Sequence, residues 1–253
     1  MDKVLIERMS WTEFEQAMKE TDVVIIPVGS LEEHGPHNPL GVDIHAAAYC
    51  AELIGQKARV PVAPVMPFGD ARGLLGFPGT VSIDTELLRQ VLVAYAESFI
   101  RHGAKRFLFI NGHGGNVPAL AMAAGDLYDK HGCVSLFTEW WVTLPEINPD
   151  WPCDDHGGYF ETSFMMGVNA SLVEMSRAQK PPETASLTAG MVGGKFRGVR
   201  IPLPIPLDKR QKMGNMGRPP AGASEEVGKA MIDAYVDYNV GLVEELKKIQ
   251  VAT

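Results

Sequence analysis

The sequence predicts an α/β protein, a three-layer α/β/α sandwich with a mostly parallel central sheet. Short apolar runs alternate with amphipathic stretches along the chain, and residues 106–111 are apolar on both faces. This alternation is typical of a parallel sheet that helices cover on both sides. No linker, charge block or internal repeat divides the 253 residues, so we expect a single domain spanning residues 1–253.

The first elements are predicted from capping residues and from the period of the apolar positions. Ser10 and Glu13 have the spacing of a capping box, so a helix should begin after Ser10. Asp84 can cap a long amphipathic helix that ends near Arg101. Between these two helices we expect a strand, a helix and an extended segment, at residues 22–29, 43–58 and 60–67.

The second half of the chain continues the alternation. Residues 106–111 predict a strand in the middle of the sheet, because both of its faces are apolar. A helix, a strand and two further helices are expected after it, at about 116–131, 133–138, from 158, and 224–248. The Gly- and Pro-rich segment 177–222 has no regular pattern, and we expect it to pass over the active face or to form a subunit contact.

The composition excludes several classes of partner. The formal net charge is −8 and the acids are scattered, which favours solubility and argues against a nucleic-acid surface. No apolar run reaches the ~20 residues needed to cross a bilayer. The chain has three cysteines without a Cys-x-x-Cys pair and no secretory pattern at its N-terminus, so we expect a cytoplasmic protein with reduced thiols.

Two polar, histidine-bearing loops follow two of the predicted strands. The first, "SLEEHGPHNPLGVD", follows the strand at 22–29, and the second, "NGHGGN", follows the strand at 106–111. In a parallel sheet, ligands bind beyond the carboxyl ends of the strands. We therefore expect both loops to face one crevice.

The first of these loops has the residue types of a metal site. If the chain is extended there, its period of two places Glu32 and His34 on one side and Glu33 on the other. Glu32 and His34 are then a candidate ligand pair, and Asp43, at the start of the next helix, could bridge two ions. Mixed histidine and carboxylate ligands suit Zn, Mn or Fe better than Ca or Mg.

Each of these residues also has a purely structural interpretation. Asp43 could simply be the N-cap of the helix that follows it. Asn-Gly and Gly-Gly are turn dipeptides, so "NGHGGN" could be only a glycine-rich turn. His37 and His45 are better explained as structural or solvent-facing residues than as ligands. The coincidence of two such loops at one end of the sheet favours a site.

A third segment, "DDHGGYFETS" at 154–163, again carries a histidine followed by two glycines and an acid. Together, "PVGSLEEHGPHNPLGVD", "GFPGT", "NGHGGN" and "HGGYFETS" resemble the motifs of the creatininase (creatinine amidohydrolase) family, in the same order. The resemblance covers most of the chain, roughly from Trp11 to Val168. It implies a creatininase-like α/β/α fold with two divalent transition-metal ions per chain.

The resemblance also implies a role for each matching residue. Asp43 would bridge the two ions. Glu32 and His113 would bind one of them, and His34 would bind the other. A water activated by both ions would attack the substrate carbonyl.

One metal ligand of the family is missing from this sequence. Creatininase has a glutamate two residues after the histidine of "NGH", and here that position is Gly115. We predict that Glu161 of "FETS" takes its place. His156, which matches the family's "HGG" histidine, would then be the catalytic proton donor, because the pKa of an imidazole lies near neutral pH.

The substrate pocket is less defined by the sequence. Trp140, Trp141 and Trp151 follow the strand at 133–138 and could form a pocket wall, although core packing explains them equally well. Asp70 and Arg72 precede "GFPGT" and could bind hydroxyl or carboxylate groups of the substrate. A surface ion pair between Asp70 and Arg72 is the alternative.

The implied function is hydrolysis at a carbonyl of a small, polar, cyclic substrate, at a C–N amide or formamide bond. The alternatives are a hydrolase that opens a cyclic keto-sugar at a C–C bond, a peptidase that trims a small modified peptide, and a non-catalytic assembly subunit. Gly114 and Gly115 replace a tyrosine and a glutamate of creatininase, and Gly76 replaces a histidine that often precedes "FPGT". We therefore expect a wider pocket and poor turnover of creatinine. Family members commonly form hexamers, so a homo-oligomer is also expected.

Overall fold

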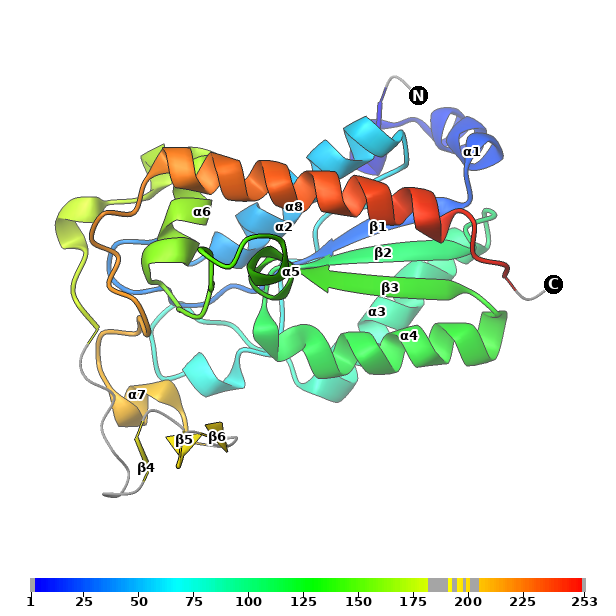
Figure 1. Ribbon diagram of the computed structural model, residues 1–253. Coiled ribbons are helices and arrows are strands. Elements are labelled where there is room, and N and C mark those ends of the chain that lie inside the picture. Colours follow the sequence, from blue (N-terminus) through cyan, green and yellow to red (C-terminus); the bar gives the residue numbers. More distant parts are fainter. Residues whose placement is uncertain (1–2, 182–190, 193–194, 198, 201–204, 252–253) are drawn as a thin grey trace.

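The computed structural model describes residues 3–181, 191–192, 195–197, 199–200 and 205–251 (Figure 1). Its central sheet is parallel and has the strand order β1-β2-β3. These strands are β1 (Val23–Val28), β2 (Arg106–Asn111) and β3 (Val134–Glu139). A separate antiparallel sheet consists of the two-residue strands β4 (Met191–Val192), β5 (Lys195–Phe196) and β6 (Val199–Arg200).

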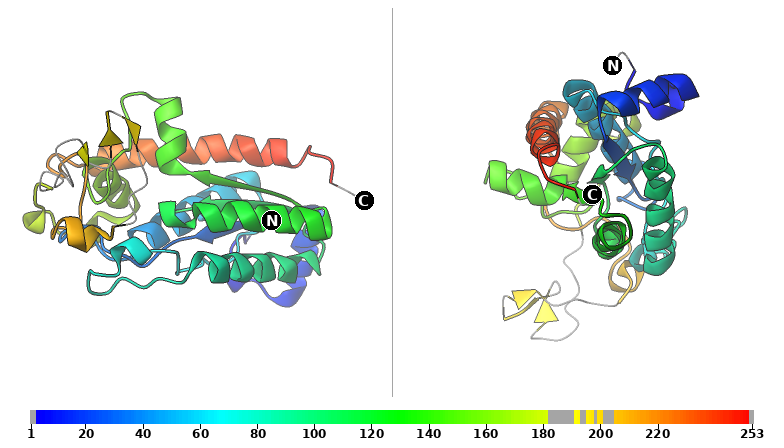
Figure 2. Two further views of the ribbon diagram at one scale, coloured as in Figure 1. Left: turned by 90° about the horizontal axis from the view of Figure 1, so that it is seen from below. Right: turned by 90° about the vertical axis from the view of Figure 1, so that its right-hand side faces the viewer.

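Helices cover both faces of the parallel sheet, which confirms the predicted three-layer sandwich (Figure 2). The first face is covered by α2 (Val42–Ala58), α5 (Trp140–Ile147), α6 (Tyr159–Asn169) and α8 (Glu225–Leu246). The second face is covered by α3 (Thr85–Ile100) and α4 (Val117–His131). Outside these layers lie α1 (Trp11–Glu20) and α7 (Leu207–Arg210).

Alternate strand residues enter two separate cores. Ile25 and Leu108 pack with the helices of the first face, whereas Val24, Phe107 and Phe109 pack with α3 and α4. This is the two-residue period of a strand that is buried on both sides. It explains why the strands read as continuous apolar runs.

The capping box predicted at the start of α1 is present. Ser10 Oγ accepts a hydrogen bond from the backbone N–H of Glu13, and the Glu13 carboxylate accepts one from the N–H of Ser10. Asp84 likewise caps α3 by accepting from the N–H of Leu87 at 2.9 Å. These helix starts were predictable because their capping partners are close in sequence.

The extended segment 60–67 runs beside β1 without forming a regular strand. The N–H of Ile25 donates to the Pro61 carbonyl, and the N–H of Ala63 donates to the Ile25 carbonyl, at 2.9 and 2.8 Å. Prolines at 61, 64 and 67 cannot donate to a ladder, so the pairing is limited to isolated bridges.

Helix α5 is a difference from the prediction. Trp140 and Trp141 were expected after the strand at 133–138, where no helix was predicted, whereas they begin this helix, which contains Pro145. Proline has no N–H for the helical ladder, so Pro145 is a local signal against a helix. The helix ends two residues after the proline, at Ile147.

All three parallel strands point toward the same end of the molecule, where α5, the start of α6 and α7 also lie (Figure 1). Short 3₁₀ helices connect the larger elements at Ile6–Arg8, Arg72–Leu74, Gly114–Asn116, Ala170–Leu172 and Met175–Arg177. Part of the segment 177–222 lies outside the described residues, and its described part includes α7. None of the helices in the described chain has both the length and the apolar character needed to span a membrane.

Candidate metal centre

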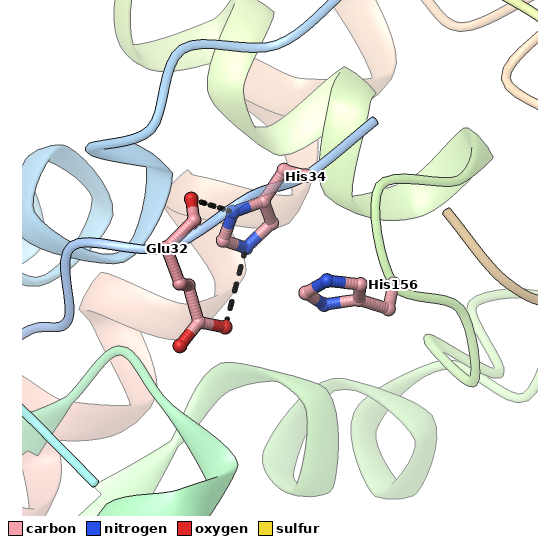
Figure 3. Close-up of side chains that lie close together, drawn as sticks. All are labelled: Glu32, His34 and His156. Atoms are coloured by element: carbon pink, nitrogen blue, oxygen red, sulfur yellow. Dashed lines mark hydrogen bonds and ion pairs between the residues drawn. The ribbon is translucent and has the colours of Figure 1, made fainter. Parts of the chain in front are cut away.

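Glu32 and His34 lie in the loop after β1, and their side chains are buried. The N–H of Glu32 donates to the Leu40 carbonyl at 2.9 Å, which holds the loop closed, and Ser30 Oγ donates to Glu32 Oε2 at 2.8 Å. His34 Nδ1 lies 3.1 Å from the Glu32 carbonyl oxygen, and Nε2 lies 4.0 Å from Glu32 Oε1 (Figure 3). Donation from Nδ1–H to the carbonyl leaves the lone pair on Nε2 free to bind a metal ion.

Asp43, in the first turn of α2, lies between two histidines. Its Oδ1 is 3.1 Å from His34 Nε2, and its Oδ2 is 3.3 Å from His113 Nδ1. The interpretation of Asp43 as a helix cap is wrong, because Gly41 is the N-cap of α2 and no side chain caps this helix. A carboxylate whose two oxygens face different imidazoles has the geometry of a bridging ligand.

His113 is oriented by the asparagine before it and by a distant backbone carbonyl. Its N–H donates to Asn111 Oδ1 at 3.1 Å, and its carbonyl accepts from Asn111 Nδ2 at 2.8 Å. On the ring, Nε2 lies 3.0 Å from the Asp70 carbonyl oxygen, while Nδ1 lies 3.0 Å from Glu32 Oε2. Donation from Nε2–H to that carbonyl leaves Nδ1 as the free donor atom on the side of Glu32 and Asp43.

Glu161, in the first turn of α6, approaches the centre from the opposite side. Its Oε1 lies 3.4 Å from His34 Nε2, and its Oε2 accepts from the N–H of Gly157 at 2.5 Å. The start of α6 is held by Asp155, whose carboxylate accepts from the N–H groups of Phe160 and Glu161 at 2.8 and 3.2 Å. These bonds fix the position of the Glu161 backbone relative to the centre.

His156 lies beside these acids, on the loop before α6. Its ring points toward His34 and Glu32, and the centroids of the two imidazoles are 4.5 Å apart (Figure 3). His156 Nε2 lies 3.2 Å from Glu33 Oε1. Reciprocal backbone hydrogen bonds with Met216, at 3.1 and 2.7 Å, hold the loop in place.

The donor atoms of these side chains form three overlapping groups in the described part of the chain, each with its atoms within 4.8 Å of one another. The groups are Glu32, Asp43 and His113; His34, Asp43 and Glu161; and Glu32, His34 and His156. His34 Nε2 and Asp43 Oδ2 are buried and lie 3.1–3.4 Å from charged side chains, but neither atom makes a hydrogen bond of suitable geometry with a described residue. Buried polar atoms are normally satisfied, so these two atoms fit a site that binds cations.

Charge pairing controls the ionisation of these buried side chains. Burial lowers the pKa of His34, but the carboxylates of Glu161 and Asp43 outweigh this effect and raise that pKa well above its ordinary value. Glu32 and Asp43 raise the pKa of buried His113 in the same way. Burial raises the pKa of Asp43, yet the two imidazoles hold it well below its usual range. Asp43 is therefore ionised at neutral pH and depends on positive charge beside it.

Gly115, where creatininase has a metal-binding glutamate, has no room for a side chain. A Cβ atom there would lie 2.1 Å from the Asp70 carbonyl oxygen and 2.4 Å from His113 Nε2. Any side chain would therefore disrupt the hydrogen bond that orients His113. The Glu161 carboxylate lies 3.4 Å from His34 Nε2, and its role as the replacement ligand stays a prediction.

A cavity of about 750 Å³ opens beside the centre. Its lining residues are Glu32, Asp43, Leu74, Gly112, His113, Gly114, Trp140, Trp141, Cys153, Asp154, Asp155, His156, Glu161, Arg210, Met216 and Gly217. Trp140 is buried and stacks on Phe164 with ring centroids 4.6 Å apart, so it is both core and wall. Trp141 is a partly buried wall residue, whereas Trp151 packs against the core and is not among the described lining residues.

Asp70 and Arg72 bind each other. Arg72 Nη2 lies 2.5 Å from Asp70 Oδ2, which also accepts from Thr85 Oγ1 at 2.5 Å. Neither residue is among the described lining residues of the cavity, and the Arg72 side chain is 62% exposed. The structure thus contains the Asp70–Arg72 ion pair that was the alternative to substrate binding. Asp70 contacts the centre through its backbone carbonyl oxygen, which lies 3.0 Å from His113 Nε2.

Two residues of the site, Asp155 and Arg210, were not singled out from the sequence. Glu33, expected on the opposite side of the chain from Glu32 and His34, lies buried against His156. Asp155 could have been recognised as an acid just before a helix start. Arg210 lies in the segment 177–222, where no sequence pattern indicated which residues would reach the cavity.

The parallel sheet, with carboxylates and imidazoles gathered beyond its carboxyl ends, defines an α/β enzyme fold with a candidate metal centre. The family model described as creatinine amidohydrolase matches residues 7–243. The chain therefore belongs to the creatininase family of hydrolases.

Two relatives and a solved structure illustrate this membership. The mycofactocin precursor peptide peptidase of Mycobacterium tuberculosis (strain H37Rv) is 30% identical over 85% of this chain and 81% of its own length. The protein of the same name from Mycolicibacterium smegmatis is 40% identical over 58% of each chain. A creatininase variant of the Zn–Zn type has a TM-score of 0.78 at 24% identity, covering 96% of this chain and 99% of its own, and this likeness establishes the fold.

Proposed function

We propose that this protein is a metal-dependent amidohydrolase that cleaves a C–N amide bond in a small polar substrate. The observation that carries the proposal is the position of Asp43, whose two carboxylate oxygens face His34 and His113 separately. Each of these histidines has a further carboxylate beside it, from Glu161 and Glu32 respectively. Two adjacent cation sites that share Asp43 account for this arrangement.

We assign Glu32, His113 and Asp43 to one ion, and His34, Glu161 and Asp43 to the other. The mixture of imidazole and carboxylate donors suits Zn, Mn or Fe. The solved creatininase variant of the Zn–Zn type supports the same choice. Divalent ions bound there would lower the pKa of a bound water toward neutrality and polarise the substrate carbonyl.

We assign to His156 the transfer of a proton to the leaving group. Glu33 holds Nε2 of the ring, at 3.2 Å, and favours its protonated form. In this orientation Nδ1 is the atom that gives a proton to the leaving nitrogen. The backbone bonds to Met216 restrict movement of the ring away from the centre.

A peptide is the second candidate substrate. Both relatives named above are called peptidases, and a peptide bond is an amide bond. The cavity of about 750 Å³ is large for creatinine. A Cβ atom at Gly114 would meet only the Trp141 ring, 4.0 Å away, so this wall has open space. We therefore expect poor turnover of creatinine and a preference for a larger amide.

The test combines metal analysis with a substrate panel. The purified protein, loaded with Zn or Mn, is assayed against creatinine, formamide-bearing heterocycles, N-acyl amino acids, short peptides and a cyclic keto-sugar. Hydrolysis of an amide with little turnover of creatinine is expected. Absence of bound transition metal, or cleavage of the keto-sugar alone, would contradict the proposal.

We further propose a cytoplasmic homo-oligomer, a hexamer by resemblance to the family. All three cysteines are free and buried, which suits a reducing compartment. Light scattering should give a mass near six chains. A monomer at micromolar concentration would contradict this assembly.

A further inference from the structure

Arg210, the last residue of α7, lines the cavity beside the metal centre. It is the one arginine or lysine among the described lining residues. Five acids share this lining: Glu32, Asp43, Asp154, Asp155 and Glu161. Despite these acids, no ion pair joins Arg210 to a described residue.

The guanidinium of Arg210 also lacks hydrogen-bond partners in the described chain. Its Nε is buried and unpaired. Arg106 also has an unpaired Nε, but its two terminal nitrogens bind Asp22 and the Ile249 carbonyl. A buried N–H without an acceptor destabilises the protein, so Arg210 is best explained by an acceptor that arrives with a ligand.

The helix that carries Arg210 is packed firmly on the protein. Leu207 and Asp208, in its first turn, are both buried. Asp208 fills the space beside Gly76, where a Cβ atom would lie 2.0 Å from Asp208 Cγ. The absence of a side chain at Gly76 is therefore what lets α7 approach the cavity.

We propose that Arg210 binds a carboxylate group of the substrate. This proposal rests on the proposed amidohydrolase function, because it concerns the substrate in the same cavity. Guanidinium groups bind carboxylates through two parallel N–H···O bonds, and one arginine balances the single charge of a carboxylate. The acids around the cavity disfavour a more highly charged phosphate. The substrate class is thus an amide with a nearby carboxylate, such as an N-acyl amino acid or the C-terminus of a peptide.

The experiment compares acids with their neutral amides as ligands of the metal-loaded protein. N-acetylglycine and N-acetylglycinamide, and a tripeptide with its C-terminal amide, are titrated while ligand binding is followed by NMR. Arg210→Met removes the charge at similar length, and Arg210→Lys keeps it. Lys209→Met is the matched control, because it removes a positive charge from the same helix at a side chain that is 68% exposed.

The acids should bind about tenfold more tightly than their amides in the parent protein and in Lys209→Met, as expected for a hydrogen-bonded charge pair. The preference should vanish in Arg210→Met and be partly kept in Arg210→Lys. Preference for N-acetylglycine indicates a small acid, and preference for the tripeptide alone indicates a peptide C-terminus.

Two results would overturn the proposal. One is equal binding of acids and amides by the parent protein, including no binding of either. The other is a preference that survives in Arg210→Met, which would place the carboxylate on the metal ions instead. Metal content and amide hydrolysis are measured on the same samples, so failure of the amidohydrolase function would be seen separately.

Discussion

Asp43 is the side chain on which the proposed centre depends most. It is buried, and it is the residue shared by the two groups assigned to the two ions. The other four proposed ligands belong to one assigned ion each. Removal of Asp43 should therefore affect both ions, whereas removal of another ligand should affect one.

Asp43→Ala should lose more metal than any other single substitution. The measurement is the metal content per chain after purification, by inductively coupled plasma mass spectrometry. Asp154→Ala is the control, because Asp154 lines the same cavity but belongs to none of the donor groups. Full occupancy in Asp43→Ala would show that the carboxylate does not bridge.

Glu161→Gln should lose one ion and keep the ion assigned to Glu32 and His113. The reason is that position 115, where creatininase has a glutamate ligand, is a glycine without room for a side chain. No side chain at that position can therefore bind the ion in place of Glu161. The same metal analysis tests this prediction, with Glu33→Gln as the matched control. Glu33 contacts His156 and should leave both ions bound. Loss of an ion from the control alone would transfer the ligand role to Glu33.

His156→Ala should keep both ions while kcat falls on the order of 10²–10⁴-fold, the usual contribution of a general acid. The structure makes this prediction demanding, because a donor atom of His156 lies within 4.8 Å of donors from Glu32 and His34. Metal content and kcat are measured on one preparation with a substrate found in the panel. If an ion is lost together with activity, His156 is a ligand and not a proton donor.

At the scale of elements, the start of α6 is the piece of secondary structure that positions the centre. Its N-cap is Gly158, which has no side chain to cap it, and the Asp155 carboxylate accepts the free N–H groups instead. Burial raises the pKa of Asp155 to about 7. Its hydrogen bonds link the stability of α6 to the position of Glu161.

Asp155→Ala should lower the free energy of unfolding by about 1 kcal/mol or more, because two N–H groups lose their acceptor. It should also weaken binding of the ion assigned to Glu161 without removing a ligand. Urea unfolding and metal titration measure the two effects. Asp155→Asn keeps one of the two acceptor oxygens, so its stability should fall between the parent and the alanine variant. Equal stability of the alanine variant would contradict the capping role.

At the scale of the whole molecule, bound metal should stabilise the fold. Each ion that binds only the folded state at a hundredfold excess over Kd adds about 2.7 kcal/mol. For a chain of this length, chelation should then lower Tm by roughly 5–10 °C for each ion removed, which calorimetry with and without EDTA would measure. Asp43→Ala should show little of this shift. An unchanged Tm in the parent protein would argue against tightly bound ions.

Much of the fold was predictable because its signals are local. The apolar run of β1, the cap of α3 by Asp84 and the capping box of Ser10 and Glu13 each depend on residues close together in the chain. Helix α5 was missed for the converse reason, since Pro145 is a local signal against a helix. There, packing of Trp140 and Leu144 in the core outweighed local preference.

The sequence by itself determined the layered α/β architecture, the family and the candidate ligands, because helix caps, strand periods and short motifs express local physical chemistry. Only the tertiary structure decided how those residues meet. The Asp70 carbonyl orients His113 across 43 positions, and Glu33 contacts His156 across 123. Arg210 reaches the cavity from a segment without a recognisable pattern. Such contacts depend on how distant segments pack, and no local period or cap encodes them.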